Sequence, residues 1–382
     1  MTDILISGAS VAGPSLAWWL SRNGFRPTVV ERAPHLRGGG YAVDFRGGVH
    51  LGILQKMGIL DEIRACQTHL ETMAYVDGSG QIIAPMPAEI FAGDVEILRG
   101  DLARILYDAT RDDTEYLFGD TITGMVEHEG GVDVTFAGAA PRTFDLVIGA
   151  DGLHSAVRSL TFGTGPDDVR DLGMYVSIFD ITTDAVPPRT AHLLSVPGKT
   201  AGIFRTDRGS IAQLFFTASP ISCDDPRLVV ADAFAGLGWQ VPWLMKQMPE
   251  ADGFYFDSVS QVYLDSWSKG RVTLAGDAAA AAGPGGNGTG NAVVAAYVLA
   301  GELAAADGDH RAAFERYEAL VRPYVGKGQK QALGGAGFLA PATEKKIAQR
   351  NRAFRLMSRL PVGGLIRYMS ARTATAIHLP TY

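Results

Sequence analysis

Acidic residues stand next to glycines at three points of the chain where a ligand could bind. The longest of these segments, residues 271–302, reads as a short buried strand, then Asp277, a glycine loop over residues 283–290 and an Ala/Val-rich helix from about residue 291 to 306. Glycines before a helix start let backbone N–H groups approach a flat or anionic ligand. A plain strand-to-helix turn seldom needs so many glycines, so the pattern favours a ligand site.

Residues 3–31 form the second segment, with the complete pattern of strand, loop, helix and second strand. The loop runs from Gly8 to Gly13, the helix covers residues 14–23 and ends at Gly24, and Glu31 closes the second strand. Glycines at this turn allow a pyrophosphate to sit on the helix amino terminus, and an acid about 20 residues later can bond a ribose hydroxyl. The segment therefore predicts a nucleotide site.

Three side chains of that segment refine the prediction. Ser10 replaces the usual middle glycine, so its side chain either crowds the phosphate or donates a hydroxyl to it. Glu31, in place of a basic residue, indicates a ribose without a 2′-phosphate, as in FAD or NAD. Arg32 is either a solvated strand-end charge or a cation that stacks on the adenine.

The third segment is a nearly continuous apolar strand, residues 144–150, that runs into Asp151 and Gly152. Strands buried on both faces of a parallel sheet have this composition. Asp151 and Ser155 either cap the short helix that follows or line a ligand crevice. Ligands of open α/β sheets bind at the carboxyl ends of the strands, so we expect all three segments to meet at one crevice.

Two further stretches carry charged side chains that could reach this crevice. Residues 35–48 are rich in glycine and include Arg37, Asp44 and Arg46, as in a loop that lines a ligand or simply meets solvent. Arg99 stands just before a predicted helix whose expected N-cap is Asp101. A cation is disfavoured at a helix start, so Arg99 is a candidate for contact with an anion or a cofactor.

From about residue 171 to 265 the pattern changes to short antiparallel strands joined by Pro/Gly turns. A sheet of this kind would cover the crevice and leave a substrate pocket between two domains. We expect His192, Phe204, Gln213 and Phe215 to face that pocket, with plain core packing as the alternative for each.

Bulk composition restricts the classes of protein. The 382 residues are 47% hydrophobic and 20% charged with a formal net charge of −7, which suits two joined domains and gives no sign of a nucleic-acid partner. Cys66 and Cys223 lie far apart and suggest neither a disulfide framework nor a metal site.

The first strand begins almost at Met1 and no apolar run is long enough to span a bilayer, so we expect a cytoplasmic protein without a membrane partner. The basic stretch after residue 341 is expected to be a solvated helix face.

The three segments together resemble those of the single-component FAD-dependent aromatic monooxygenases with the p-hydroxybenzoate hydroxylase fold. The residues that carry the resemblance are Gly8 to Gly13 with Glu31, Asp151-Gly152 with Arg158, and Gly276-Asp277 with the loop through Thr289. In its compact length and helical end the chain is most similar to the tetracycline-inactivating and related antibiotic-modifying monooxygenases.

This resemblance implies an α/β fold, with a Rossmann-like FAD-binding domain, an inserted antiparallel-sheet substrate domain and C-terminal helices. The FAD-binding domain would comprise residues 1–70, 96–170 and 266–335. The substrate domain would comprise residues 71–95 and 171–265, and the helical segment residues 336–382.

The same resemblance implies roles for individual residues. Glu31 would bind the adenosine ribose, and Arg37 would contact NADH or NADPH. The full set of expected FAD contacts is Gly8, Ser10, Ala12, Gly13, Glu31, Arg32, Asp44, Arg99, Asp151, Gly152, Asp277, Gly286, Asn287, Gly288 and Thr289. The candidate substrate contacts are His192, Phe204, Gln213, Phe215 and Pro284. The chain departs from the family at Ala280, where a histidine is usual, and in a proline-to-glycine loop about one residue shorter.

FAD would carry the chemistry of such an enzyme. NADH or NADPH would reduce FAD, O₂ would add as a flavin C4a-hydroperoxide, and its distal oxygen would pass to an electron-rich aromatic or polyketide-like small molecule. His192 is the candidate base for a phenol, no metal is expected, and the chain would be a monomer or a homodimer. The alternatives are an FAD-dependent dehydrogenase, halogenase-like enzyme or reductase on this fold, and a flavin-bearing protein that binds a ligand without turnover. An NAD-dependent Rossmann dehydrogenase leaves the Gly276-Asp277 loop unexplained.

Overall fold

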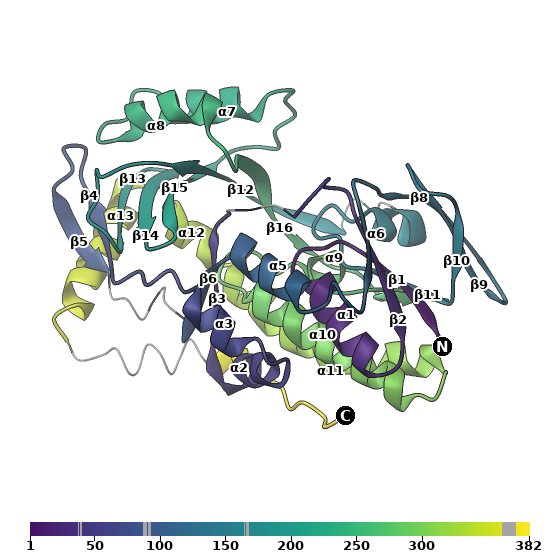
Figure 1. The fold of residues 1–382 in the computed structure, drawn as a ribbon. Coiled ribbons are helices and arrows are strands. Elements are labelled where there is room, and N and C mark those ends of the chain that lie inside the picture. The colour runs from purple at the N-terminus through teal and green to yellow at the C-terminus, as the bar shows by residue number, and fades with distance from the viewer. Residues whose placement is uncertain are drawn as a thin grey trace.

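The computed structural model has two layers of strands, one mainly parallel and one mainly antiparallel, with helices between and around them (Figure 1). It describes residues 1–36, 38, 40–86, 90, 93–163, 165, 168–360 and 372–382. Arg37, the predicted contact for NADH or NADPH, lies outside the described residues.

A six-stranded sheet forms the first layer, in the order β17-β18-β11-β1-β2-β7. Neighbouring strands are parallel except for the pair β17–β18. β1 and β11 are apolar runs in which almost every residue is buried, as expected of strands covered on both faces. In sheet order the strands span Ser268–Lys269, Val272–Leu274, Leu146–Gly149, Asp3–Ser7, Arg26–Glu31 and Glu115–Phe118.

Three helices and a small sheet cover this first layer. α1 packs against α10, and α10 packs against α11 (Figure 1). Most residues of α10 are buried all around the helix, which is typical of a helix inside the core. The helices span Ala12–Arg22 (α1), Gly288–Ala305 (α10) and His310–Ala332 (α11), and the small antiparallel sheet contains β8 (Ile122–His128), β9 (Gly131–Phe136) and β10 (Arg142–Phe144).

A seven-stranded sheet forms the second layer, in the order β16-β12-β15-β14-β13-β4-β5. All neighbouring strands are antiparallel except β13 and β4. The sheet therefore joins two stretches that are far apart in the sequence. In sheet order the strands span Tyr255–Val262, Val169–Ile181, Gly209–Thr217, Lys199–Thr206, Thr190–Val196, Thr72–Val76 and Ile82–Met86.

Helices cover both faces of the seven-stranded sheet. Phe234 anchors α7 on one face, and Phe354 anchors α13 on the other. Arg350 of α13 is buried, with its guanidinium 3.6 Å from the centroid of the Tyr75 ring. The basic helix is therefore partly a packing element rather than only a solvated face. These helices span Pro226–Phe234 (α7), Val241–Gln247 (α8), Gly335–Leu339 (α12) and Glu344–Met357 (α13).

Short elements connect the two layers. β3 and β6 pair as an antiparallel ribbon, and β6 leads directly into α5. The remaining elements are β3 (Ala42–Phe45), α2 (Gly47–Lys56), α3 (Leu60–Ala65), β6 (Val95–Leu98), α5 (Arg99–Asp108), α6 (Ala156–Phe162), the 3₁₀ helix η1 (Met248–Glu250) and α9 (Asp277–Ala280).

The predicted fold class is confirmed, with two local corrections. α10 begins at Gly288, earlier than expected, because Asn287 adopts left-handed backbone angles (φ 58°) and ends the preceding loop. That loop, residues 281–287, is called the glycine loop below. α5 begins at Arg99, and Asp101 in its first turn pairs with Arg208 at 3.1 Å instead of capping the helix. Within the described residues, no helix is long and apolar enough to cross a membrane.

Candidate active site

The three predicted ligand segments meet at one edge of the six-stranded sheet. β18, β11 and β1 are parallel neighbours, so the chain leaves each of them at the same edge. A Cβ atom added to Gly8 would lie 2.5 Å from the Ala150 carbonyl oxygen, and one added to Gly276 would lie 3.0 Å from the Ala12 Cβ. The glycines therefore permit backbones from all three segments to approach closely.

Arg158 ties two of these segments together. Its Nη1 donates to the Ala278 carbonyl at 3.1 Å, and its Nη2 donates to the Leu153 carbonyl at 2.6 Å. The side chain is only 6% exposed. Burial lowers the pKa of this guanidinium, although arginine stays charged at any physiological pH. Arg158 thus holds the turn after β11 against the turn after β18.

Two helices point uncapped amino termini toward this region. α1 and α10 have neither a side-chain cap nor an acidic residue in the first turn. The first N–H groups of a helix need acceptors, and the helix dipole favours negative charge there. Both helix starts can therefore receive an anionic or electron-rich part of a ligand.

The hydrogen bonds between Arg99 and Ser10 show which of the two predicted roles the Ser10 hydroxyl can take. The Arg99 guanidinium donates to the Ser10 Oγ from Nε at 3.1 Å and from Nη2 at 2.9 Å. The hydroxyl is thus an acceptor for Arg99 and keeps its own hydrogen available for a ligand. The cation therefore lies beside the loop before α1, and its predicted contact with an anion or a cofactor stays a prediction.

Asp277 lies in the wall of the crevice, and its carboxyl is accessible to a ligand. It is solvent-accessible, yet burial by the protein around it raises the pKa of its carboxyl, and the nearby Arg99 opposes that shift. Its Oδ1 would lie 3.6 Å from a Cβ placed on Gly288, at the start of α10. No hydrogen bond to this carboxyl occurs among the residues that the structure describes. Asp277 is therefore available to a ligand.

The other predicted acids already have protein partners. Glu31 accepts the N–H groups of Ala9 and Ala33, both at 2.8 Å, and so braces the loop before α1. Asp44 forms an ion pair with Arg46. A second lone pair on each Glu31 oxygen still leaves room for a ribose hydroxyl.

Asp151 has the capping role that was one of its two predicted alternatives. Its carboxylate accepts the Ser155 hydroxyl at 2.5 Å and the Ala156 N–H at 2.8 Å. Ser155 in turn accepts the Arg158 N–H at 2.9 Å and caps α6. Gly152 follows with φ +80°, and no atom lies within 4 Å of the Cβ position there, so its backbone is open to a ligand.

Three polar residues at the crevice edge were missed from the sequence. His154 Nε2 lies 2.9 Å from the Asp257 carboxylate, and the Tyr255 hydroxyl donates to the same carboxylate at 3.1 Å. The hydrogen bond to Asp257 raises the pKa of His154, against burial and the nearby Arg158 and Arg32. His154 stands two residues after Gly152, and this closeness in the sequence could have predicted its place at the crevice edge. Tyr255 and Asp257 come from β16, and nothing local in the sequence connects them to this edge.

Of the four residues predicted to face the substrate together, three share one face of the sheet, whereas His192 lies on the other face. Pairing places Phe204 opposite Ala191, whereas His192 lies opposite Ile203. Partners across a sheet share a face and successive residues alternate, so His192 points to the face opposite that of Phe204. Gln213 and Phe215 share the face of Phe204, because Phe204 pairs with Ile211 two residues before Gln213. His192 therefore lies on the side of α7 and α8.

The face with Phe204 and Phe215 is the one turned toward the glycine loop. Phe215 packs in a cluster with Leu339 and Leu172, and Leu172 lies 3.5 Å from a Cβ placed on Gly283. Pro284 lies against α12, since a Cβ on Gly335 would be 2.8 Å from the Pro284 carbonyl oxygen. The sheet face, α12 and the glycine loop thus surround one region.

Ala280 lies beside a very small cavity beneath α10. This cavity has a volume of about 10 Å³ and is also lined by Asp277, Asn291 and Tyr317. Such a space holds one water molecule at most. The departure from the family pattern thus leaves a methyl group, with no hydrogen-bonding atom, beside this cavity.

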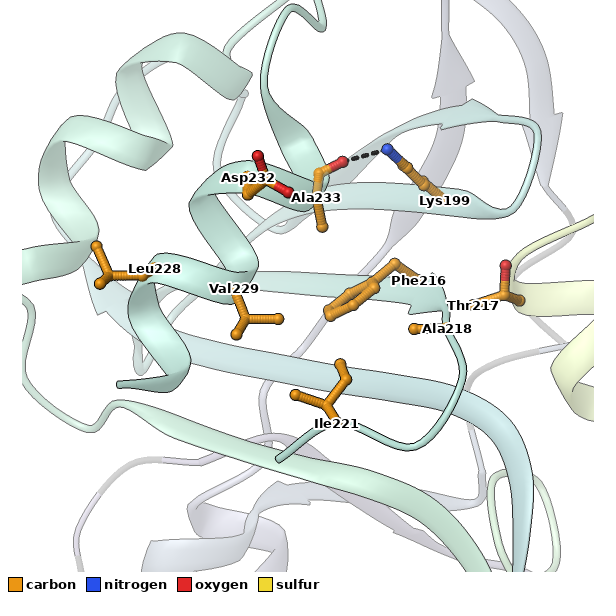
Figure 2. Close-up of a pocket in the computed structure, with 9 residues that line it drawn as sticks. All are labelled: Lys199, Phe216, Thr217, Ala218, Ile221, Leu228, Val229, Asp232 and Ala233. Atoms are coloured by element: carbon orange, nitrogen blue, oxygen red, sulfur yellow. Dashed lines mark hydrogen bonds between the residues drawn. The ribbon is translucent and has the colours of Figure 1, made fainter. Parts of the chain in front are cut away.

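A larger hollow of about 500 Å³ lies elsewhere, between α7 and β15 (Figure 2). Phe216, Val229 and Ile221 line it, and Lys199 at its edge donates to the Ala233 carbonyl. Phe216 packs in the cluster with α7 and α8, on the same sheet face as His192. The hollow is therefore separate from the crevice at the strand ends.

The groups at the crevice suit FAD. An extended dinucleotide needs an anion site at a helix start, an acid for the ribose and a flat backbone surface for the ring. Here α1 with Arg99 and Ser10 would hold the pyrophosphate, Glu31 the ribose, and the start of α10 the flavin. The free Asp277 carboxylate and the open backbone at Gly152 add hydrogen-bonding groups between these points.

Comparison with known proteins agrees with this geometry. Residues 1–222 match the FAD binding domain family. A flavin-dependent monooxygenase from an unknown prokaryotic organism is 37% identical over 401 residues, covering 99% of this chain and 98% of that protein. A flavin-dependent monooxygenase from Legionella longbeachae is 36% identical, covering 86% of this chain and 87% of that protein.

Solved structures show the same relationship over the whole chain. The crystal structure of tetracycline destructase Tet(51) is 34% identical, with a TM-score of 0.86, and the match covers all of both chains. That of tetracycline destructase Tet(55) is 34% identical, with a TM-score of 0.84, over 100% of this chain and 99% of that one. The chain therefore belongs to the FAD binding domain family, among the FAD-dependent monooxygenases that have the p-hydroxybenzoate hydroxylase fold.

Proposed function

We propose that this enzyme uses NADH or NADPH and O₂ to hydroxylate an electron-rich aromatic or polyketide-like small molecule. The observation that carries the proposal is the shared sheet face of Phe204, Gln213 and Phe215, which is turned toward the glycine loop. Aromatic rings would stack on a flat substrate between this face and the flavin. The similarity to tetracycline destructases supports a polycyclic substrate.

Gln213 is the polar group best placed to orient such a substrate. Its side chain is half-buried, and its amide has no hydrogen-bond partner in the part of the chain that the structure describes. A half-buried amide among apolar side chains gains stability when a ligand supplies a partner. Pro284, on the glycine loop, would contact the substrate from the opposite side.

The chain's own groups would prepare the site for oxygen transfer. Bound FAD would supply electron transfer from the nicotinamide nucleotide and the activation of O₂. The first N–H groups of α10 would stabilise negative charge on the pyrimidine edge of the flavin. α12 and the sheet face would keep water away, which limits unproductive release of hydrogen peroxide.

The nicotinamide nucleotide would approach along the edge with the positive groups. Arg32 and His154 lie near each other there, both are exposed, and Arg158 adds a third charge. In this proposal residues 1–70, 96–170 and 266–335 hold FAD, residues 71–95 and 171–265 form the substrate domain, and residues 336–382 are the C-terminal helical segment. His192 takes no part, because it lies on the other side of the sheet.

The test is a screen of NADH and NADPH consumption with purified flavin-loaded protein. Simple phenols, aromatic polyketides and tetracyclines would each be added, and products of any hit analysed by mass spectrometry. The proposal expects substrate-stimulated oxidation and a product with one added oxygen atom. A product without added oxygen would indicate a dehydrogenase. A ligand that binds without stimulating oxidation across the panel would indicate a binding protein.

A further inference from the structure

The glycine loop has three buried backbone carbonyl groups that accept hydrogen bonds from side-chain amides outside the loop. Ala281, Ala282 and Gly286 are buried, and the loop lies between the short helix α9 and the start of α10. Buried carbonyl groups outside regular structure need hydrogen-bond donors from elsewhere. Here side-chain amides donate to all three, and the Ala281 carbonyl also accepts the Val262 N–H of β16 at 3.2 Å.

Two glutamines donate to the first half of the loop. Gln329 of α11 donates from Nε2 to the Ala281 carbonyl at 3.1 Å and to the Val262 carbonyl at 2.8 Å. Gln261 of β16 donates from Nε2 to the Ala282 carbonyl at 2.7 Å and to the Gln329 carbonyl at 2.8 Å. Both glutamine side chains are buried, so water cannot replace them freely.

The second half of the loop is held in a similar way. Asn291 of α10 donates from Nδ2 to the Gly286 carbonyl at 2.9 Å. A Cβ atom on Gly328 would lie 2.4 Å from the Gly286 carbonyl oxygen, so the backbone of α11 also touches the loop. The loop is therefore fixed at both ends.

These donors come from both layers of the fold. Gln261 lies at the end of β16, the outermost strand of the seven-stranded sheet, whereas Gln329 lies on α11, which packs with α10 beside the six-stranded sheet. Gln261 is itself oriented by the Tyr263 hydroxyl, which donates to its Oε1 at 2.7 Å. Gln261 and Gln329 thus connect the position of the seven-stranded sheet with the position of the glycine loop.

We propose that Gln261 and Gln329 form an amide clamp that positions the glycine loop, and with it the flavin ring, against the substrate sheet. They are positioning residues, because they act through the loop. The inference rests on the proposed function in one respect, the placement of the flavin along the loop and the start of α10. Loss of the clamp removes the amide donor of the buried Ala282 carbonyl and one of the two donors to the Ala281 carbonyl. The loop can then move, which weakens FAD binding and admits water to the reduced flavin.

The test compares Gln329→Met and Gln261→Met with the wild-type protein. Methionine keeps the length of the side chain and removes the donors. We expect the dissociation constant for FAD to rise about tenfold, the equivalent of one lost hydrogen bond. The visible absorption bands of the bound flavin should shift, and more hydrogen peroxide should form per NADH or NADPH consumed.

Gln331→Met is the matched control. Gln331 lies on the same helix and donates to the same loop, at the Gly285 carbonyl over 3.0 Å, but it is exposed. Water can take its place, so its effect on the dissociation constant should stay within about twofold. Tyr263→Phe is the mild variant in case a methionine variant does not fold. It removes only the hydroxyl that orients Gln261, and a rise of about threefold is expected.

The inference is overturned if the clamp variants, or Tyr263→Phe alone, bind FAD with wild-type affinity and an unchanged flavin spectrum. A loss of stability without a change in the flavin would then assign a merely structural role. Failure of the proposed function looks different. In that case the wild-type protein binds FAD but oxidises no NADH or NADPH with any substrate, while the affinity and spectrum of the variants still decide the clamp.

Discussion

Arg158 Nη1 lies 3.1 Å from the carbonyl oxygen of Ala278, and this hydrogen bond joins two turns that are 120 residues apart in the sequence. One turn follows β11 and the other follows β18, and these two strands are neighbours in the six-stranded sheet. A single buried side chain thus fixes the relative position of two of the three segments that we expect to form the FAD site.

Arg158→Met should destabilise the protein and weaken FAD binding. The change leaves the carbonyl groups of Leu153 and Ala278 without their donor, at a cost of about 2–4 kcal/mol in the free energy of unfolding. Urea denaturation measures that change. Arg26→Met is the control: Arg26 is exposed and pairs with Asp3, so less than about 1 kcal/mol should be lost. Equal losses for the two variants would contradict the bridging role.

Gly13→Ala should abolish FAD binding. A Cβ atom at this position would lie 1.9 Å from the Gly8 carbonyl oxygen, a distance that forces the loop before α1 out of place. Gly52→Ala in α2 is the matched control, because nothing lies within 4 Å of its Cβ position. Alanine there should stabilise the protein by about 0.5–1 kcal/mol. Flavin retained through purification of both variants is the measurement, and a yellow Gly13→Ala protein would refute the argument.

Local and long-range features of the site differ in how well the sequence predicts them. The turns at Gly8 and Asp277 depend on a few consecutive residues, so their types and spacing were sufficient. The face of His192 depends on the register between β13 and β14, which the alternation within one strand cannot supply. Likewise, Tyr255 and Asp257 reach the crevice edge only through the pairing of β16 with β12. Contacts of that kind follow from tertiary packing, and no local signal precedes them.

Gln213→Leu should raise the KM for the substrate about tenfold and change kcat little. One hydrogen bond to a ground-state ligand accounts for such a loss, since it is uniform between the bound substrate and the transition state. His192→Leu should leave both constants within about twofold, because its side chain lies on the other face of the sheet. Steady-state kinetics with any substrate from the screen decides between them. The reverse pattern would mean that the sheet presents its other face.

The stability contributed by His154 should depend on pH. The hydrogen bond to Asp257 raises the pKa of His154 above 6.5, so folding favours the protonated imidazole. That contribution is complete below the unfolded-state pKa of about 6.5 and is lost as the pH rises through the folded-state pKa. His154→Gln should therefore cost less than about 1 kcal/mol near pH 5.5, since the side chain is 67% exposed, and nothing near pH 9. A cost that grows with pH would contradict the assignment.

The most direct test of the whole account is turnover in isotope-labelled O₂. Flavin-loaded protein, NADH or NADPH and a substrate from the screen would react under the labelled gas, and mass spectrometry would locate the label. The account predicts one labelled oxygen atom in the product, and no product without the nicotinamide nucleotide. An oxidised product that carries no label would contradict the proposed monooxygenation.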